Sequence, residues 1–250
     1  MRKTFFILCT LSISITTNAQ DYWKRLPVPT QIGITKISVN INADIFVFAY
    51  DGVYRSTNNG KDWNKVLTLD TGIYSIDSVG NIYAAQSLND QLLVSKDNGT
   101  SWTYKALPNG FNYPISTANN GYVIINTYDQ NENITGMFLS KDAGDTWEKI
   151  ATPRIFIENF ELYNNNYLVL CTQNPSSYKD EFYYSLDWGK SWKIIIPPPG
   201  EVSDPPIMVE NRIIVNCYNG IFKSSDYGNT WEKVFSTSFG RIMMNYEKNE

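Results

Sequence analysis

Short runs rich in apolar and aromatic residues recur along the chain, separated by Gly, Asn, Asp and Ser. Examples lie at residues 52–55, 91–94 and 181–184, which are rich in Val, Leu, Tyr and Phe. Runs of this length, bounded by turn-forming residues, are typical of β-strands. No stretch shows a sustained period of 3.6 residues. The pattern therefore predicts an all-β fold of many short strands.

A second pattern, S-x-D-x-G-x-[TS]-W, occurs five times, at spacings of 39, 45, 45 and 39 residues. Its repeated residues are Ser56, Asn58, Gly60 and Trp63; Ser95, Asp97, Gly99 and Trp102; Ser140, Asp142, Gly144 and Trp147; Ser185, Asp187, Gly189 and Trp192; and Ser224, Asp226, Gly228 and Trp231. Self-similarity at a period of about 40 residues indicates a repeat architecture.

The residue types of this motif predict a turn. Asp accepts hydrogen bonds from nearby backbone amides, and Gly adopts the positive φ that other residues resist. The Ser and Thr hydroxyls tie down further backbone groups, and the Trp ring is expected to pack beside the next strand. The first copy has Asn58 in place of Asp and Asp62 in place of Ser or Thr. We expect that turn to be the loosest of the five.

Each motif lies between two strands, and two more strands fill every interval, as at residues 74–77 and 81–84. Four short strands in about 40 residues make one blade of a β-propeller. The chain thus predicts five full blades plus a partial sixth, with residues 23–26 as an outer strand and 239–246 as an inner strand. The alternative is a five-bladed ring that closes with loose ends. A partial sixth blade is favoured, because propellers avoid exposed sheet edges.

The motif resembles the Asp-box, or bacterial neuraminidase repeat, of sialidases, sortilin-type receptors and photosystem assembly factors. The resemblance covers the five turns and points to no single member. It implies a β-propeller in which the Asp boxes are structural. For function it implies either glycoside hydrolysis or the binding of another macromolecule.

The first 19 residues differ from the rest. Arg2 and Lys3 precede an apolar run from Phe5 to Ile15, and Ala19 offers a small residue for cleavage before Gln20. This is the pattern of a secretory signal peptide, and the run is too short to span a membrane. We expect residues 1–19 to be a signal peptide and residues 20–250 to be one propeller domain. The protein is then secreted or periplasmic.

Charge and composition exclude several functions. The net charge is −4, and removing residues 1–19 makes it −6, so the basic footprint that nucleic acid requires is missing. The chain has no histidine, which excludes Ser-His-Asp and Cys-His catalysis and removes the commonest zinc ligand. Its three cysteines lack metal-ligand spacing. The sequence predicts no cofactor and no metal ligand.

Blade geometry predicts which face carries a ligand. Strands alternate in direction, so the Asp boxes share one face and the connections between second and third strands share the other. The longer repeats gain their extra residues on this other face, at 128–133 and 174–180. Elongated loops often carry binding sites. The candidate ligand-binding residues are Tyr113, Tyr128, Asp129, Glu158, Tyr178, Asp204 and Arg241. The alternative is that these loops are ordinary solvated connections.

Four further residues have two interpretations each. Trp188 and Tyr227 occupy the variable tips of two neighbouring repeats, where they either stack on sugar rings or, as we favour, pack on their own turns. Cys171 and Cys217 fall eight residues after Tyr163 and Val209, in corresponding strands of adjacent blades. They form either a disulfide or, as we favour, two buried free thiols, because neighbouring blades splay apart.

Three functions remain in competition. The favoured one is a non-enzymatic binding or scaffolding module that contacts a protein or polysaccharide. The second is a glycoside hydrolase. A sialidase-like site needs three converging arginines, which the mature chain's Arg25, Arg55, Arg154, Arg212 and Arg241 are not placed to supply. A xyloglucanase-like site needs two carboxylates, for which Glu158 and Asp204 are the candidates. The third possibility is a truncated, inactive propeller fragment.

Overall fold

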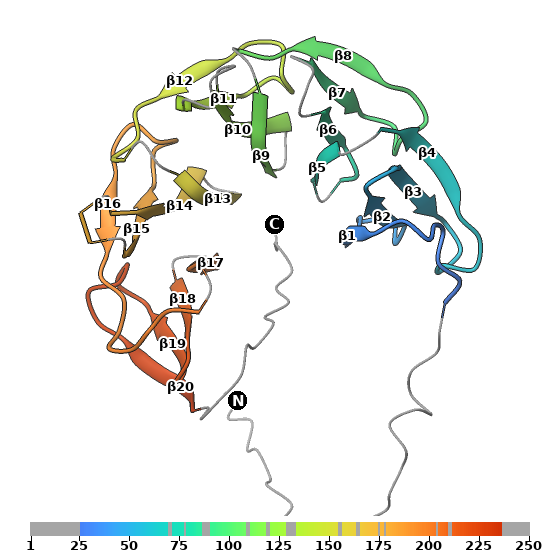
Figure 1. Ribbon diagram of the computed structural model, residues 1–250. Helices are drawn as coiled ribbons and strands as arrows, with labels where there is room; N and C mark the ends of the chain where they lie inside the picture. Colours follow the sequence, from blue (N-terminus) through green and yellow to red (C-terminus); the bar gives the residue numbers. More distant parts are fainter. Residues whose placement is uncertain are drawn as a thin grey trace, which may run out of the picture.

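Five four-stranded antiparallel sheets are arranged around a common centre in the computed structural model (Figure 1). The structure describes residues 26–69, 72–77, 79–86, 91–108, 111–118, 121–128, 134–154, 157–163, 166–174, 176–177, 179–203, 205–209 and 212–236. In every sheet the strand that comes first in the sequence lies innermost and the fourth lies outermost. The all-β propeller fold expected from the repeats is confirmed.

The blades follow the chain in order. Blade 1 holds β1 (Ile34–Val39), β2 (Ile45–Ala49), β3 (Gly52–Ser56) and β4 (Asn64–Thr68). Blade 2 holds β5 (Gly72–Ile76), β6 (Ile82–Gln86), β7 (Gln91–Ser95) and β8 (Thr103–Ala106). Blade 3 holds β9 (Phe111–Ala118), β10 (Tyr122–Tyr128), β11 (Ile134–Ser140) and β12 (Glu148–Ile150). Blade 4 holds β13 (Ile157–Tyr163), β14 (Tyr167–Gln173), β15 (Asp180–Ser185) and β16 (Lys193–Ile195). Blade 5 holds β17 (Ile207–Val209), β18 (Arg212–Cys217), β19 (Gly220–Ser224) and β20 (Glu232–Ser236).

The middle strands of blades 2, 3 and 4 are buried on both faces, because each of these blades packs against a neighbour on either side. In β14, Leu168 and Leu170 belong to the core shared with blade 3, whereas Val169 and Cys171 belong to the core shared with blade 5. Successive residues of a strand point to opposite faces. A strand buried on both faces is therefore apolar along its whole length, as in the sequence Leu168–Cys171.

A set of hydrogen bonds holds each motif, which we call the repeat turn, between the third and fourth strands of its blade. In the third copy the Ser140 hydroxyl donates to Asp142 Oδ1 (2.8 Å) and accepts from the Gly144 amide (2.7 Å). The Thr146 amide donates to Asp142 Oδ1 (2.8 Å), and the Thr146 hydroxyl donates to Asp142 Oδ2 (2.6 Å). Ala143, like Gly144, has a positive φ, of 61° against 90°. Two left-handed residues in succession bring these groups together.

The first copy keeps these contacts with one pair of roles exchanged. The Asn58 side-chain amide donates to Asp62 Oδ2 (2.8 Å), and the Asp62 backbone amide donates to Asn58 Oδ1 (2.9 Å). In the third copy the hydroxyl of Thr146 donates to the carboxylate of Asp142. In the first copy the side-chain amide of Asn58 donates to the carboxylate of Asp62 instead. The two departures from the motif compensate each other. The first copy thus makes hydrogen bonds that correspond to those of the other turns. That this turn is the loosest of the five stays a prediction.

The Trp of each repeat turn binds the preceding blade. Its indole N–H donates to a backbone carbonyl at or just after that blade's outer strand, as Trp102 does to Val66 (2.9 Å) and Trp192 does to Ala151 (2.7 Å). The turn glycine allows this close approach: a Cβ on Gly189 would stand 2.3 Å from Ile150 Cγ2 of the preceding blade. Each repeat turn thus closes its own hairpin and joins two blades.

The first repeat turn also bonds a backbone carbonyl that precedes its own blade. Trp63 donates to the Pro27 carbonyl (2.9 Å), four residues after Trp23, as Ala106 is four residues after Trp102. Pro27 thus takes the place of an outer-strand residue in a preceding blade. Blades 1 and 5 stand at opposite ends of an open arc (Figure 1), which does not match a closed ring of five.

Blade 1 has an exposed apolar face on the same side. Ile37 of β1 is 63% exposed, whereas its counterparts Tyr74, Ile115 and Phe160 are 8%, 7% and 3% exposed. Those counterparts are covered by a preceding blade. The segments predicted to form the sixth blade are residues 23–26 and 239–246, and apart from Leu26 they lie outside the described residues, as does the predicted signal peptide 1–19. The described ranges include no helix with the length and apolar character needed to cross a membrane.

Replacing a repeat-turn serine tests the hydrogen bonds of the turn. The Ser185→Ala change removes a buried hydroxyl that donates to Asp187 and accepts from the Gly189 amide. A buried amide without an acceptor costs about 1–3 kcal/mol, so the free energy of unfolding in urea should fall by that amount. Lys190→Ala, on the exposed surface of the same turn, should change it by less than about 0.5 kcal/mol. Equal losses in both variants would show that the hydroxyl contributes nothing specific.

Acid should weaken the repeat turns. The hydroxyl and backbone amide of Thr146 hold the pKa of Asp142 at about 2, against an ordinary value of 3.8, and Asp97 and Asp226 have pKa values of about 2 for the same reason. A lowered pKa stabilises the fold above the unfolded pKa, and this contribution is lost as the pH falls toward 2. The melting temperature should therefore decline between about pH 4 and pH 2. The Asp142→Asn variant should show a shallower decline, and an identical slope would contradict this cause.

Candidate functional site

The two faces of the ring have different roles. We call the side with the repeat turns the repeat-turn face, and the side with the connections between second and third strands the loop face. On the repeat-turn face, Asn40 of blade 1 donates to the Asn98 side chain of blade 2 (2.8 Å), and Arg55 bonds both Asp44 and the Asn98 carbonyl. The polar groups of the repeat turns are thus engaged in holding blades together.

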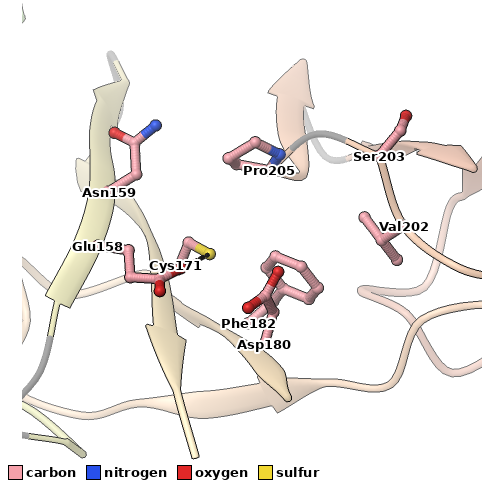
Figure 2. A pocket seen from close by; sticks show the side chains of 8 residues that line it. All are labelled: Glu158, Asn159, Cys171, Asp180, Phe182, Val202, Ser203 and Pro205. Atoms are coloured by element: carbon pink, nitrogen blue, oxygen red, sulfur yellow. Dashed lines mark hydrogen bonds between the residues drawn. The ribbon is translucent and has the colours of Figure 1, made fainter. Parts of the chain in front are cut away.

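A crevice of about 140 Å³ opens between blades 4 and 5 (Figure 2). Glu158, Cys171 and Asp180 line one side, from β13, β14 and β15 respectively. Val202 and Pro205, which precede β17, line the other side. The buried ring of Phe182 lies next to Asp180. The crevice therefore combines polar side chains of blade 4 with an apolar wall from blade 5.

An irregularity in β13 places Glu158. Ile157 pairs with Thr172 and Asn159 pairs with Cys171, so the register shifts at Glu158, which has no partner in β14. Such a β-bulge re-aims a side chain and is common next to functional sites. Asp180 begins β15, where it pairs with Gln173. The sheet thus brings together three residues that are far apart in the sequence.

The three side chains form a compact polar cluster. Their potential ligand atoms all lie within 4.8 Å of one another, and Cys171 Sγ is 3.8 Å from Glu158 Oε2. Burial and the nearby charges of Asp180 and Glu158 raise the pKa of the Cys171 thiol to about 12. The thiol is therefore protonated at neutral pH. Glu158 and Asp180 are exposed, and neither forms an ion pair within the described part of the chain.

Glu181, the next residue along β15, forms an ion pair with Arg154. Glu181 accepts two hydrogen bonds from Arg154, at 2.8 and 3.2 Å, one from Asn174 (2.6 Å) and one from Tyr183 (2.8 Å). These bonds, that of Arg154 first, hold the pKa of Glu181 at about 2. Arg154 is committed to this cluster. It does not take part in a group of converging arginines of the sialidase kind.

One predicted site residue, Glu158, lies in the crevice. Tyr113 and Tyr128 belong to β9 and β10, but their side chains are outside the described part of the structure. Asp129, Tyr178, Asp204 and Arg241 also lie outside the described residues. The pairing of Glu158 with Asp204 therefore stays a prediction.

Sequence analysis missed Cys171 and Asp180 as site residues. Asp180 ends the predicted insertion at 174–180, and Cys171 is predicted to be either a disulfide partner or, as favoured, a buried free thiol. Motif spacing detects ligands that lie close together in the sequence, and here β13, β14 and β15 each contribute one residue. The available signal was an acidic or thiol side chain at the loop-face end of three consecutive strands.

The structure shows what the rings of Trp188 and Tyr227 contact. Each ring packs on an aromatic ring of the preceding blade, a contact that the sequence did not predict. Trp188 contacts Tyr122 of blade 3 edge-to-face, with ring centroids 4.5 Å apart and planes at 88°. Tyr227 stacks on Tyr184 of blade 4 at 5.4 Å and 13°. The rings extend the contact between blades that the repeat-turn Trp begins.

Cys171 and Cys217 are free and buried, as expected. Their positions are not equivalent, however. In each blade the repeat-turn serine pairs with one residue of the second strand: Ser185 pairs with Leu168, and Ser224 pairs with Ile213. Cys171 lies three residues after Leu168, whereas Cys217 lies four residues after Ile213. The two thiols therefore point from opposite sides into the same core between blades 4 and 5.

Both thiols should resist modification in the folded protein. Each is buried, and burial raises the pKa of both, so little reactive thiolate forms. A thiol reagent should leave the mature protein unlabelled under native conditions. It should label both cysteines in denaturant without a reductant, as mass spectrometry would show. Failure to label in denaturant would indicate a disulfide and contradict the structure.

Comparison with known proteins identifies the fold. No protein-family model and no curated protein sequence matches the chain. Among solved structures, the GH74 xyloglucanase from Xanthomonas campestris matches with a TM-score of 0.59 at 19% identity, covering 82% of this chain and 39% of that enzyme. An ancestral GH74 enzyme matches with a TM-score of 0.58 at 15% identity, over 81% and 33% of the two chains.

YCF48 from Cyanidioschyzon merolae matches with a TM-score of 0.56 at 12% identity, over 85% of this chain and 74% of that protein. The chain thus spans 39% and 33% of the two GH74 enzymes and about three quarters of YCF48. Identities this low show a shared fold. Together with the five four-stranded sheets, they place the chain among the β-propellers.

Proposed function

We propose that this protein is an exported, non-enzymatic propeller of the Asp-box kind that binds a protein or polysaccharide through its loop face at blades 4 and 5. The observation that carries the proposal is the crevice between these blades, where Glu158 and Asp180 are exposed without an ion-pair partner in the described ranges. Polar groups left unengaged on a rigid scaffold are the usual means of recognition.

The contrast between the two faces supports this choice. On the repeat-turn face, the Ser, Asp and Trp side chains of the motif are bonded within the turn or to the preceding blade. On the loop face, blades 3 and 4 carry the longest connections between second and third strands. Variation there does not disturb the contacts between blades. A ligand site on the loop face therefore disturbs the packing of the blades least.

Size and charge favour a protein partner. Pockets that enclose a whole small ligand measure about 300–1,000 Å³, so a crevice of about 140 Å³ accepts a single side chain or an ion. Two carboxylates at its mouth favour a Lys or Arg side chain over a neutral sugar. The fold likeness to xyloglucanases assigns no catalytic residue to this chain, so hydrolysis is an alternative for the experiment to detect.

Export is proposed from residues 1–19 alone, through their charged start, apolar centre and Ala19. A protein recovered from outside the cytoplasm should begin at Gln20, as N-terminal sequencing would show. An intact Met1 in the exported fraction would contradict cleavage.

Binding of basic peptides and of glycans tests the proposed site. The double variant Glu158→Gln, Asp180→Asn removes both charges and leaves the side-chain size unchanged. Losing contacts to charged groups should weaken a basic ligand at least tenfold, which corresponds to about 1.4 kcal/mol. The matched control Asp145→Asn lies in a repeat turn on the opposite face and should bind as the wild type does.

Three outcomes decide the matter. A basic peptide that binds the wild type and the control but not the double variant supports a protein partner. A glycan that shows the same pattern supports a polysaccharide. Unchanged affinity in the double variant, or release of sugar from any glycan, would overturn a non-enzymatic binding site in this crevice.

A further inference from the structure

Three different strands contribute a metal-ligating side chain to one end of the crevice. Glu158 projects from the bulge in β13, Cys171 from β14 and Asp180 from the start of β15 (Figure 2). Their ligand atoms lie within 4.8 Å of one another and line the same cavity of about 140 Å³. Two carboxylates and one thiol therefore converge on a space large enough for an ion.

The thiol is the less usual member of this cluster. Cys171 is only 5% exposed, and Figure 2 shows its sulfur directed into the crevice. Within the described residues its hydrogen-bonding contact is the long one to Glu158, at 3.8 Å, inside the cluster itself. The sulfur therefore faces the cavity, and the partner described for it belongs to the cluster.

Cys217 provides an internal comparison. It is buried in the same core, from the facing strand β18 of blade 5. Among the described residues, the charge that acts on its thiol is that of Lys233. Burial of a cysteine in this core therefore does not require neighbouring acids. The carboxylates beside Cys171 call for a separate explanation.

We propose that Cys171, Glu158 and Asp180 bind one divalent transition-metal ion of the Zn²⁺ class. A thiolate is a soft ligand that Mg²⁺ and Ca²⁺ do not favour, whereas Zn²⁺ accepts thiolate and carboxylate together. Three protein ligands leave the fourth position of a tetrahedral ion open toward the crevice, for water or for a group of a ligand. The site goes beyond the proposed binding function and does not depend on it.

The distances suit such an ion after a small adjustment. Zn–S bonds are about 2.3 Å and Zn–O bonds about 2.0–2.2 Å, so the ligand atoms of one tetrahedral ion lie roughly 3.5 Å apart. The three atoms here spread over up to 4.8 Å. Glu158 and Asp180 are exposed and can rotate by the missing ångström, whereas the buried Cys171 stays in place.

The charges balance on binding. The Cys171 S–H bond breaks, its proton leaves to solvent, and the sulfur electron pair forms the bond to the ion. The two carboxylates, already ionised, each contribute an oxygen. Three negative ligands then surround a dication.

Titration of the metal-free full-length mature protein with Cd²⁺ tests the site, because Cd²⁺ reports thiolate binding through an ultraviolet charge-transfer band. We expect one equivalent to produce the band in the wild type, Zn²⁺ to compete for it, and Mg²⁺ to leave it unchanged. Cys171→Ser should abolish the band, whereas the control Cys217→Ser should keep it. Asp180→Asn, an exposed change that spares the fold, should weaken Cd²⁺ on the order of tenfold or more.

Other results would overturn the site. Absence of the band in the wild type would do so, and so would a band that persists in Cys171→Ser or that requires Cys217. A cooperative thermal melt of each variant shows that it is folded. The partner experiment remains separate, because Cys171→Ser removes the metal ligand and leaves both carboxylates available to a basic peptide.

Discussion

The contact between the indole of one repeat turn and the backbone of the preceding blade is the constraint on which the rest of the structure depends. A four-stranded sheet with two apolar faces is not stable alone, so each blade needs neighbours at a set distance and angle. Trp192 supplies both, through its bond to the Ala151 carbonyl and through its ring against Ile150. The Ser185–Asp187 bonds hold the turn in the shape that aims this ring.

This use of the repeat turn divides the ring into a structural face and a variable face. The carboxylates of the turns are bonded to hydroxyls and amides, and the chain tolerates exchange there only in compensating pairs, as in Asn58 and Asp62. The loop face has no such restriction. Blade 4 illustrates the consequence, because a longer connection after β14 changes its loop-face edge while its repeat turn keeps the common geometry.

The crevice between blades 4 and 5 shows how adjacent residues of one strand acquire different chemistry. Glu181 points to the side of its strand that faces blade 3. There Arg154, from the connection between blades 3 and 4, and Asn174 and Tyr183 of blade 4 satisfy both carboxylate oxygens. Asp180 precedes it by one residue and faces the crevice beside the Cys171 thiol. The alternation of a strand sends one carboxylate into a closed ion-pair cluster and the other toward a cavity. The first positions the loop, and the second remains available to a ligand.

The amino-acid sequence by itself determined the repeat, the strands, the turns and the propeller, because these depend on local chemistry repeated every 40 residues or so. It also placed Glu158 on the loop face, since strand direction alone decides that. Contacts between blades were decided by tertiary structure. The rings of Trp188 and Tyr227 turned to the preceding blade, and Cys171 and Cys217 proved to be one residue out of step. Asp180 joined Cys171 through pairing across β14 and β15. Register, bulges and the packing of one sheet on the next set these neighbours, and no local pattern records them.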